Sequence, residues 1–161
     1  MPERRCGECG GVVVVLQDQW KLVSYPGVFV CSTGCILTWI RKHYSSTYEL
    51  LEAIDLSAGE REYKSDFERV FAAWLYANHL DFRYECWGFE VGKTKTYTPD
   101  FFIPSHGCFV ETKGRWGLGQ KTKLWEWQEQ YPAIPLLVAH WLIWAELRQV
   151  KVARPIGAVA R

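Results

Sequence analysis

The chain has 161 residues, of which 48% are hydrophobic and 23% charged, and its formal net charge is +1. This length and balance predict one globular domain, or one domain with a small appendage, and they exclude a disordered or fibrous chain. A near-neutral charge also excludes the strong overall basic field of many nucleic-acid-binding proteins. No stretch has the pattern of a signal peptide or a membrane span, so we expect an intracellular, cytoplasmic protein.

Two cysteine pairs dominate the first 45 residues. Cys6 and Cys9 form a CxxC pair, and Cys31 and Cys35 form a CxxxC pair after 21 intervening residues. Four thiolates match tetrahedral structural zinc, and the second pair opens an expected amphipathic helix at 36–44, where the helix dipole favours anionic sulfur. We therefore predict a treble-clef-like module with one structural zinc in residues 1–45. The alternative is four free thiols in a core.

The end of that helix and the segment after it carry weaker signals. Arg41 and Lys42 are candidates for contacts with nucleic-acid phosphates, although such a pair is more often an ordinary solvated face. Residues 46–64 have the composition of a helical linker, with a short helix at 47–54 and a polar stretch after it. The linker would separate the cysteine module from the rest of the chain.

An α/β pattern begins at residue 65. Ser65 is an expected N-cap, and apolar residues then recur at helical spacing, which predicts a helix ending near Asn78. Residues 82–91 alternate as a strand, 92–96 form a polar turn, and a hairpin follows with strands at 100–103 and 108–113. The pattern then predicts a loop at 114–119, a helix at 120–131 and a buried strand at 136–141. This order predicts a small mixed sheet flanked by helices.

The hairpin carries the residues with the clearest chemistry. Asp100 follows Pro99 at the start of one strand, while Glu111 and Lys113 share one face of the other because side chains alternate along a strand. A tight turn at 105–107 sets Asp100 opposite residues 111–113. Two carboxylates and one ammonium group are therefore expected to converge at the open end of the hairpin.

Phosphodiester hydrolysis requires such a set. The carboxylates of Asp100 and Glu111, with the backbone carbonyl of Thr112, offer the oxygen ligands that Mg²⁺ or Mn²⁺ prefers. A bound metal lowers the pKa of water and stabilises charge on the phosphate, and Lys113 would orient or help to deprotonate the attacking water. The alternative is a solvent-facing Glu-x-Lys strand with an ordinary ion pair. Pro99 and the apolar flanks of the hairpin favour a buried active site.

From Ser65 to Trp116 the chain resembles the junction-resolving endonuclease I family of T-odd bacteriophages, within the PD-(D/E)xK nuclease superfamily. The residues that carry the resemblance are Tyr97-Thr98-Pro99-Asp100-Phe101 and Phe109-Val110-Glu111-Thr112-Lys113-Gly114. The resemblance implies a restriction-endonuclease-like core in residues 65–161, ending in a basic tail. It further implies homodimers that cut branched DNA and leave 5′-phosphate and 3′-hydroxyl ends.

The resemblance also implies a role for Glu68. It marks Asp100, Glu111 and Lys113 as the catalytic residues and Glu68 as the acidic residue on the helix that completes the metal site. Glu68 lies three residues after the expected N-cap Ser65, which is where a capping box places a glutamate. The two roles are compatible.

Basic residues near the hairpin are candidates for contacts with DNA phosphates: Lys93, Lys95, Arg115, Lys121 and Lys123. Such contacts would position DNA without reading its sequence. Each is also compatible with an ordinary solvated surface.

The sequence departs from the phage family in two places. We expect no four-cysteine module in that family, and the tail after Trp141 does not match it. We expect a Mg²⁺-dependent endonuclease, encoded by a phage or mobile element, that is structure-selective for branched DNA such as four-way (Holliday) junctions. One alternative is a sequence- or lesion-specific endonuclease on the same core, and another is a non-catalytic zinc-stabilised DNA-binding protein.

Overall fold

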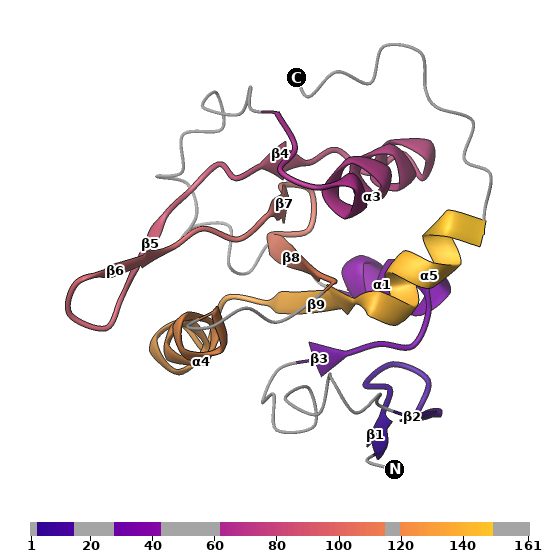
Figure 1. Cartoon of the computed structure of the whole chain (residues 1–161), viewed down its shortest axis with the longest axis horizontal. Coiled ribbons are helices and arrows are strands. Elements are labelled where there is room, and N and C mark those ends of the chain that lie inside the picture. Colours follow the sequence, from indigo (N-terminus) through magenta and orange to yellow (C-terminus); the bar gives the residue numbers. More distant parts are fainter. Residues whose placement is uncertain (1–2, 15–27, 43–61, 115–119, 150–161) are drawn as a thin grey trace.

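The computed structural model describes residues 3–14, 28–42, 62–114 and 120–149 (Figure 1). The helix expected at 47–54, most of the linker, the loop at 115–119 and the basic tail lie outside these residues. The helices are α1 (Thr33–Lys42), α3 (Asp66–Ala77), α4 (Gln120–Gln130) and α5 (Trp141–Gln149). The strands are β1 (Glu3–Arg5), β2 (Val12–Val14), β3 (Val28–Phe29), β4 (Arg83–Tyr84), β5 (Phe89–Val91), β6 (Lys95–Tyr97), β7 (Phe101–Ile103), β8 (Cys108–Lys113) and β9 (Leu136–His140).

A five-stranded mixed sheet in the order β3-β9-β8-β7-β4 forms the centre of the molecule. β9 runs parallel to both of its neighbours, β3 and β8, whereas β7 is antiparallel to β8 and β4. The pairs β1-β2 and β5-β6 form separate two-stranded sheets, and β5-β6 extends away from the centre (Figure 1). The predicted α/β fold, a small mixed sheet flanked by helices, is confirmed.

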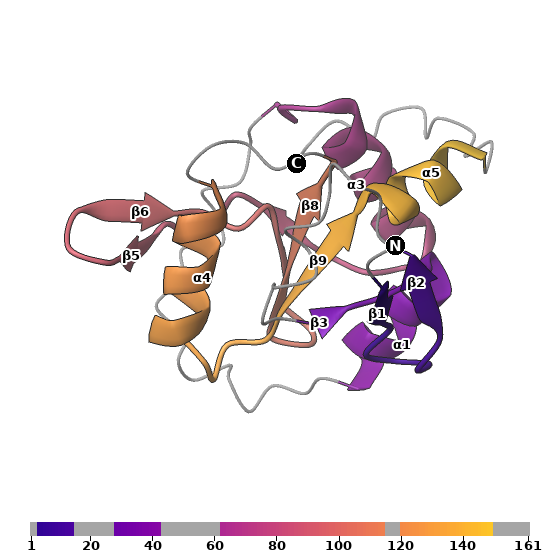
Figure 2. The same cartoon turned by 60° about the horizontal axis from the view of Figure 1, so that its bottom comes forward.

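The two faces of this sheet bury different parts of the chain. Side chains alternate along each strand, so Phe101 and Val110 face one way while Phe102 and Phe109 face the other. The first face packs against α1, α3 and α5 in one cluster of buried residues. The second packs against α4 and the β5-β6 pair in another (Figure 2). Helices on both sides explain why β9 is buried along its whole length and is apolar up to its last residue.

The N-terminal segment belongs to the same sheet and core. β3 pairs with β9, and Ile36 and Ile40 of α1 are fully buried in the cluster that contains α3 and α5. His140 at the end of β9 stacks on Phe29, with ring centroids 4.0 Å apart, and its Nε2 lies 2.7 Å from the carbonyl oxygen of Val30. The division into 1–45, 46–64 and 65–161 remains a prediction, but the cysteine segment shares its packing with the rest of the chain.

Three expected elements differ from the structure. The strand expected at 82–91 is two strands, β4 and β5, in different sheets, because Glu85 adopts a left-handed backbone with φ 44° and interrupts the extended run. The turn expected at 92–96 is shorter, since Lys95 and Thr96 pair with β5. The strand expected to reach Trp141 ends at His140, where α5 begins. The predicted hairpin strands at 100–103 and 108–113 are confirmed by β7 and β8.

Among the described residues, the helices are all too short or too polar to cross a lipid bilayer.

Candidate active site

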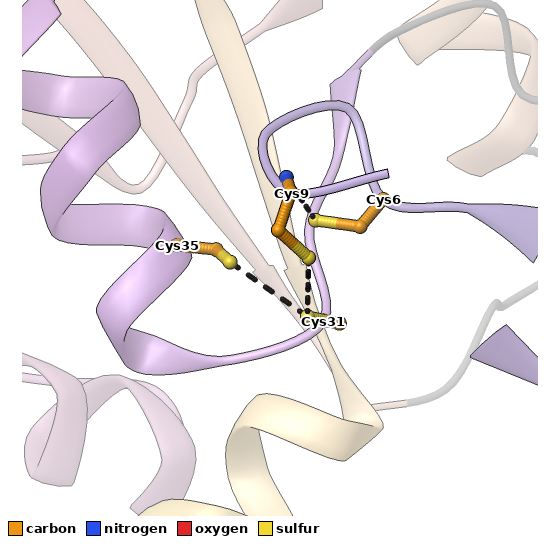
Figure 3. A group of neighbouring side chains, drawn as sticks. All are labelled: Cys6, Cys9, Cys31 and Cys35. Carbon is orange, nitrogen blue, oxygen red and sulfur yellow. Dashed lines mark hydrogen bonds between the residues drawn. The ribbon is translucent and has the colours of Figure 1, made fainter. Parts of the chain in front are cut away.

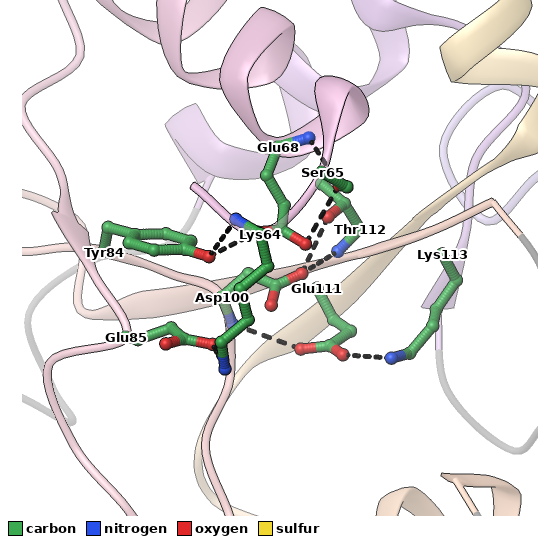
Figure 4. Close-up of polar contacts among 9 residues, drawn as sticks. All are labelled: Lys64, Ser65, Glu68, Tyr84, Glu85, Asp100, Glu111, Thr112 and Lys113. Carbon is green, nitrogen blue, oxygen red and sulfur yellow. Dashed lines mark hydrogen bonds and ion pairs between the residues drawn. The ribbon is translucent and has the colours of Figure 1, made fainter. Parts of the chain in front are cut away.

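The β7-β8 hairpin brings Asp100, Glu111 and Thr112 into one hydrogen-bonded group (Figure 4). The backbone N–H of Asp100 donates to Glu111 Oε2 at 3.1 Å. The N–H and hydroxyl groups of Thr112 both donate to Asp100 Oδ2, at 2.8 and 2.7 Å. All three residues are buried. The convergence expected from the hairpin register is therefore present, and the carboxylate positions are set by backbone groups as well as side chains.

Charges in this group perturb one another. Burial raises the pKa of Asp100 well above its usual range, and the nearby charges of Glu111 and Glu68 raise it further, against the lowering effect of the Thr112 hydrogen bonds. Lys113 Nζ lies 2.6 Å from Glu111 Oε1. Burial alone would lower the pKa of Lys113, but the carboxylates of Glu111, Asp100 and Glu68 outweigh it and raise that pKa. Lys113 is therefore held in its ammonium form.

Glu68 makes the contacts expected at the start of a capped helix and also faces the hairpin residues. Ser65 is the N-cap of α3: its hydroxyl accepts from the Glu68 N–H at 3.2 Å and donates to Glu68 Oε1 at 3.0 Å. The other oxygen of Glu68 accepts from the Lys64 N–H at 3.0 Å and from the Tyr84 hydroxyl. The Glu68 carboxylate thus caps the helix while it also lines the pocket described next. Its metal-binding role remains a prediction.

A pocket of about 450 Å³ contains this group. It is lined by Lys64, Glu68, Glu85, Thr96, Tyr97, Thr98, Asp100, Glu111, Lys113 and Lys123. Sequence reasoning missed Lys64 and Glu85, and it also missed Tyr84, whose hydroxyl donates to Glu68. The sequence offered one signal for Glu85, which is a glutamate inside an apolar run that resembles a strand. Lys64 lies next to the N-cap, and no sequence pattern pointed to it.

The predicted DNA-contacting residues divide by position. Lys123 lines the pocket, and its Nζ donates to the carbonyl of Thr96 at 3.3 Å. Lys95 in β6 and Lys93 in the turn before it are exposed, and Lys95 Nζ lies 3.4 Å from Glu126. Arg41 and Lys42, in the last turn of α1, are not among the residues that line the pocket. Arg115 and the side chain of Lys121 lie outside the described residues.

The four cysteines of the N-terminal segment converge as well (Figure 3). Their sulfur atoms all lie within 4.8 Å of one another. The Cys9 and Cys31 sulfurs are 3.5 Å apart, and those of Cys31 and Cys35 are 3.7 Å apart. Four ligands at the usual Zn–S distance stand about 3.8 Å apart around a tetrahedral ion. The cysteine geometry therefore fits zinc.

Local structure positions these thiols. Cys6 and Cys9 lie in the turn that joins β1 to β2, where the Gly10 N–H donates to the Cys6 carbonyl at 3.0 Å with φ 74° at Gly10. Cys35 is in the first turn of α1. Burial raises the pKa of the Cys6 thiol, but backbone hydrogen bonds from Cys9, Glu8 and Cys31 outweigh it and lower the pKa to about 7. Burial and the neighbouring thiols raise the pKa of Cys31 to about 12, and burial also raises the pKa of Cys35, so Cys6 becomes a thiolate more readily than either of them.

The carboxylate group fits a different kind of ion. Asp100 and Glu111 present oxygen ligands, their mutual repulsion raises the pKa of Asp100, and a divalent cation would relieve that repulsion. Cysteine sulfur and carboxylate oxygen suit soft and hard ions respectively, so the two centres are chemically distinct.

Comparison with known proteins identifies the family to which the chain is similar. The family model described as phage endonuclease I matches residues 53–140. "Endonuclease I" of Escherichia phage T7 is 33% identical over 79 residues, which are 47% of this chain and 52% of the relative. "Endodeoxyribonuclease 1" of Enterobacteria phage T3 is 32% identical over 79 residues, 47% of this chain and 51% of the relative.

The chain spans about half the length of these two curated relatives. The family match, by contrast, covers more than half of the 161 residues and includes the whole β7-β8 hairpin as well as the start of α3. The chain therefore belongs to the phage endonuclease I family.

Proposed function

We propose that this protein is a divalent-metal-dependent DNA endonuclease, structure-selective for branched DNA such as four-way junctions. It would hydrolyse phosphodiester bonds to leave 5′-phosphate and 3′-hydroxyl ends. The observation that carries the proposal is the pocket in which Asp100, Glu111 and Lys113 converge. The names of the phage T7 and T3 relatives support the same reaction class.

The residues of the pocket have separate roles in this proposal. Asp100, Glu111 and the carbonyl of Thr112 would hold Mg²⁺ or Mn²⁺, with Glu68 completing the site. A bound ion would supply a water of lowered pKa and offset negative charge on the phosphate. The raised pKa of Lys113 favours the ammonium form, which can orient the attacking water and stabilise developing negative charge. Lys123 would hold a flanking phosphate.

The decisive measurement is cleavage of a labelled four-way junction beside the matching linear duplex, with Mg²⁺ added and Lys113→Ala as the blank. Cutting of the junction alone, lost in the variant, is the expected result. Equal cutting of both substrates would retain the nuclease and contradict junction selectivity. Binding without metal-dependent cutting would favour the non-catalytic alternative.

The proposal includes a homodimer, because resolving a junction requires paired cuts in two strands. Light scattering coupled to size-exclusion chromatography, at the concentration used for cleavage, tests this directly. A dimer mass is expected, whereas a monomer that cuts both strands of one junction would contradict it.

We also propose one structural zinc per chain on Cys6, Cys9, Cys31 and Cys35. The ion is expected to survive extensive dialysis. Elemental analysis of the dialysed protein should give one zinc per chain, and a value near zero would remove the zinc assignment.

A further inference from the structure

Glu85 is held at the pocket in a costly arrangement. Its residue is 6% exposed, and its backbone has φ 44°. For a residue other than glycine, that left-handed conformation is strained. The Glu85 N–H donates to the carbonyl of Asp100 at 2.7 Å, which ties the bend to the first residue of the catalytic hairpin. A buried carboxylate on a strained backbone beside a proposed active site calls for a functional explanation.

Lys64 is the partner of this carboxylate. Its Nζ lies 2.5 Å from Glu85 Oε1, although the two residues are 21 positions apart in the sequence (Figure 4). The Lys64 side chain is 68% exposed, whereas that of Glu85 is 5% exposed. The Lys64 backbone is also fixed, because its N–H donates to Glu68 Oε2 at 3.0 Å and to the Tyr84 hydroxyl at 3.2 Å. Both ends of the Lys64 side chain are thus anchored, while its ammonium group remains open to solvent.

The charges that line the pocket suggest a role for the Lys64–Glu85 pair. Glu68, Glu85, Asp100 and Glu111 all line it and would repel a DNA strand. A lysine ammonium has three N–H donors, and the contact with Glu85 leaves donors for another acceptor. A fixed, solvent-facing cation at the rim of an acidic pocket is suited to a phosphate oxygen.

We propose that Lys64 binds a backbone phosphate of the DNA strand in the pocket, and that Glu85 is the positioning residue that holds Lys64 there. This inference rests on the proposed endonuclease function. It assigns Glu85 no contact with the metal, so a second metal site at Glu85 is the competing outcome of the test.

The first experiment measures binding of a fluorescent four-way junction in Ca²⁺ instead of Mg²⁺, over a range of salt concentrations. Lys64→Ala should weaken binding about tenfold and reduce the slope of log K against log salt by about 1. Arg69→Ala is the matched control: Arg69 also lies at the start of α3 but pairs with Asp66 outside the pocket, so binding should not change. Lys64→Ala with wild-type affinity and slope would overturn the inference.

The second experiment tests the positioning role. Glu85→Gln should weaken junction binding, and the double variant with Lys64→Ala should bind no more weakly than Lys64→Ala alone. Additive losses would contradict positioning. If Glu85→Gln raises the Mg²⁺ concentration needed for half-maximal cleavage while Lys64→Ala does not, Glu85 is a metal ligand and the inference is wrong.

Three outcomes separate failure of this inference from other failures. If the circular dichroism spectrum shows that Glu85→Gln is unfolded, the Lys64→Ala variant still tests the phosphate contact. Lys64 is exposed, so its truncation leaves the core intact. If wild-type protein cuts no DNA with Mg²⁺ or Mn²⁺, the proposed function fails. Cutting by wild-type protein with an unaffected Lys64→Ala variant removes only the Lys64 assignment.

Discussion

At the scale of single residues, Asp100 lies in an arrangement that suits the proposed metal binding and lowers the stability of the fold. Its carboxylate is buried next to that of Glu111, and burial followed by the charge of Glu111 raises the pKa of Asp100. Two buried carboxylates destabilise the folded chain when no cation lies between them. Function and stability therefore make opposite demands on this residue.

We predict that Asp100→Asn abolishes cleavage without weakening the fold. The amide oxygen can still accept from the Thr112 N–H and hydroxyl groups, while the repulsion with Glu111 is removed. Cleavage should fall about a thousandfold or more. The free energy of unfolding, measured in urea without added Mg²⁺, should stay equal or rise by about 1 kcal/mol.

Glu111→Gln is the companion variant and should also lose cleavage. Normal cutting rates in either variant would show that the active site lies elsewhere.

His140 is a second residue whose burial has a measurable consequence. Burial lowers the pKa of His140 from its ordinary value of 6.5 to about 4. The contact with the Val30 carbonyl raises this pKa, whereas the charge of Arg4 lowers it further. The folded chain thus keeps His140 neutral, whereas the unfolded chain protonates it below about pH 6.5. Stability from this residue is present above pH 6.5 and is lost as the pH falls toward 4.

We predict that this loss amounts to about 3 kcal/mol. Urea unfolding between pH 7 and pH 4 measures it, with His140→Gln as the reference. The glutamine of the variant cannot titrate in this range, so the stability of the variant should vary less with pH. Any zinc released by acid would destabilise both proteins equally, and the difference between their stabilities therefore reports His140 alone. An NMR titration that places the pKa of His140 near 6.5 would contradict the argument.

At the scale of elements, the start of α3 is both a helix cap and a wall of the pocket. Ser65 exchanges hydrogen bonds with Glu68, and Glu68 in turn accepts from Tyr84 of β4. The cap therefore determines where the Glu68 carboxylate points. Stability of the helix and geometry of the proposed metal site depend on the same contacts.

We predict that Ser65→Ala lowers the free energy of unfolding by about 1 kcal/mol, because the N-cap acceptor is lost. It should also reduce cleavage, since Glu68 loses the hydroxyl that holds Oε1. Ser65→Thr keeps a hydroxyl and should retain both properties. Loss of stability with unchanged cleavage would show that the cap does not position Glu68 for catalysis.

At the scale of the whole molecule, the cysteine cluster is connected through the sheet to β8, the strand that carries Glu111 and Lys113. β3 lies beside β9, and β9 lies beside β8, where Glu111 pairs with Val138 and Lys113 with His140. α5 adds a second connection, since Glu146 accepts from the N–H of Thr33 at 3.0 Å at the start of α1. The segment that carries the proposed zinc site thus also forms one edge of the sheet.

We predict that removing zinc with a thiol- and nitrogen-based chelator in excess Mg²⁺ lowers the melting temperature by several degrees. Hydrogen exchange should increase in β3 and β9, because the edge strand loses its anchor. Cys35→Ser should reproduce both effects. Cys86→Ala lies outside the cluster and should keep its zinc, and an unchanged melting temperature in the zinc-free protein would refute the coupling.

Local information in the sequence was sufficient for the centre of the candidate site. Strand alternation, the turn after Pro104 and the approach of Asp100 to residues 111–113 involve residues close together along the chain, so the β7-β8 hairpin could be predicted. The spacing of the four cysteines likewise predicted that they converge, and the structure brings their sulfur atoms together. The mixed sheet followed from the order of the elements.

Only the tertiary structure decided the features that depend on distant contacts. Glu85 bends its backbone where it meets the Asp100 carbonyl, which split the strand expected at 82–91. β3 joins β9 although more than 100 residues separate them, and no local pattern could reveal that pairing. Lys64 and Glu85, which are 21 residues apart, meet at the pocket through a contact that no local pattern predicts. The sequence by itself determined which residues are candidates for the chemistry, because hairpin register and cysteine spacing are local patterns, whereas burial and long-range pairing decided which neighbours surround them.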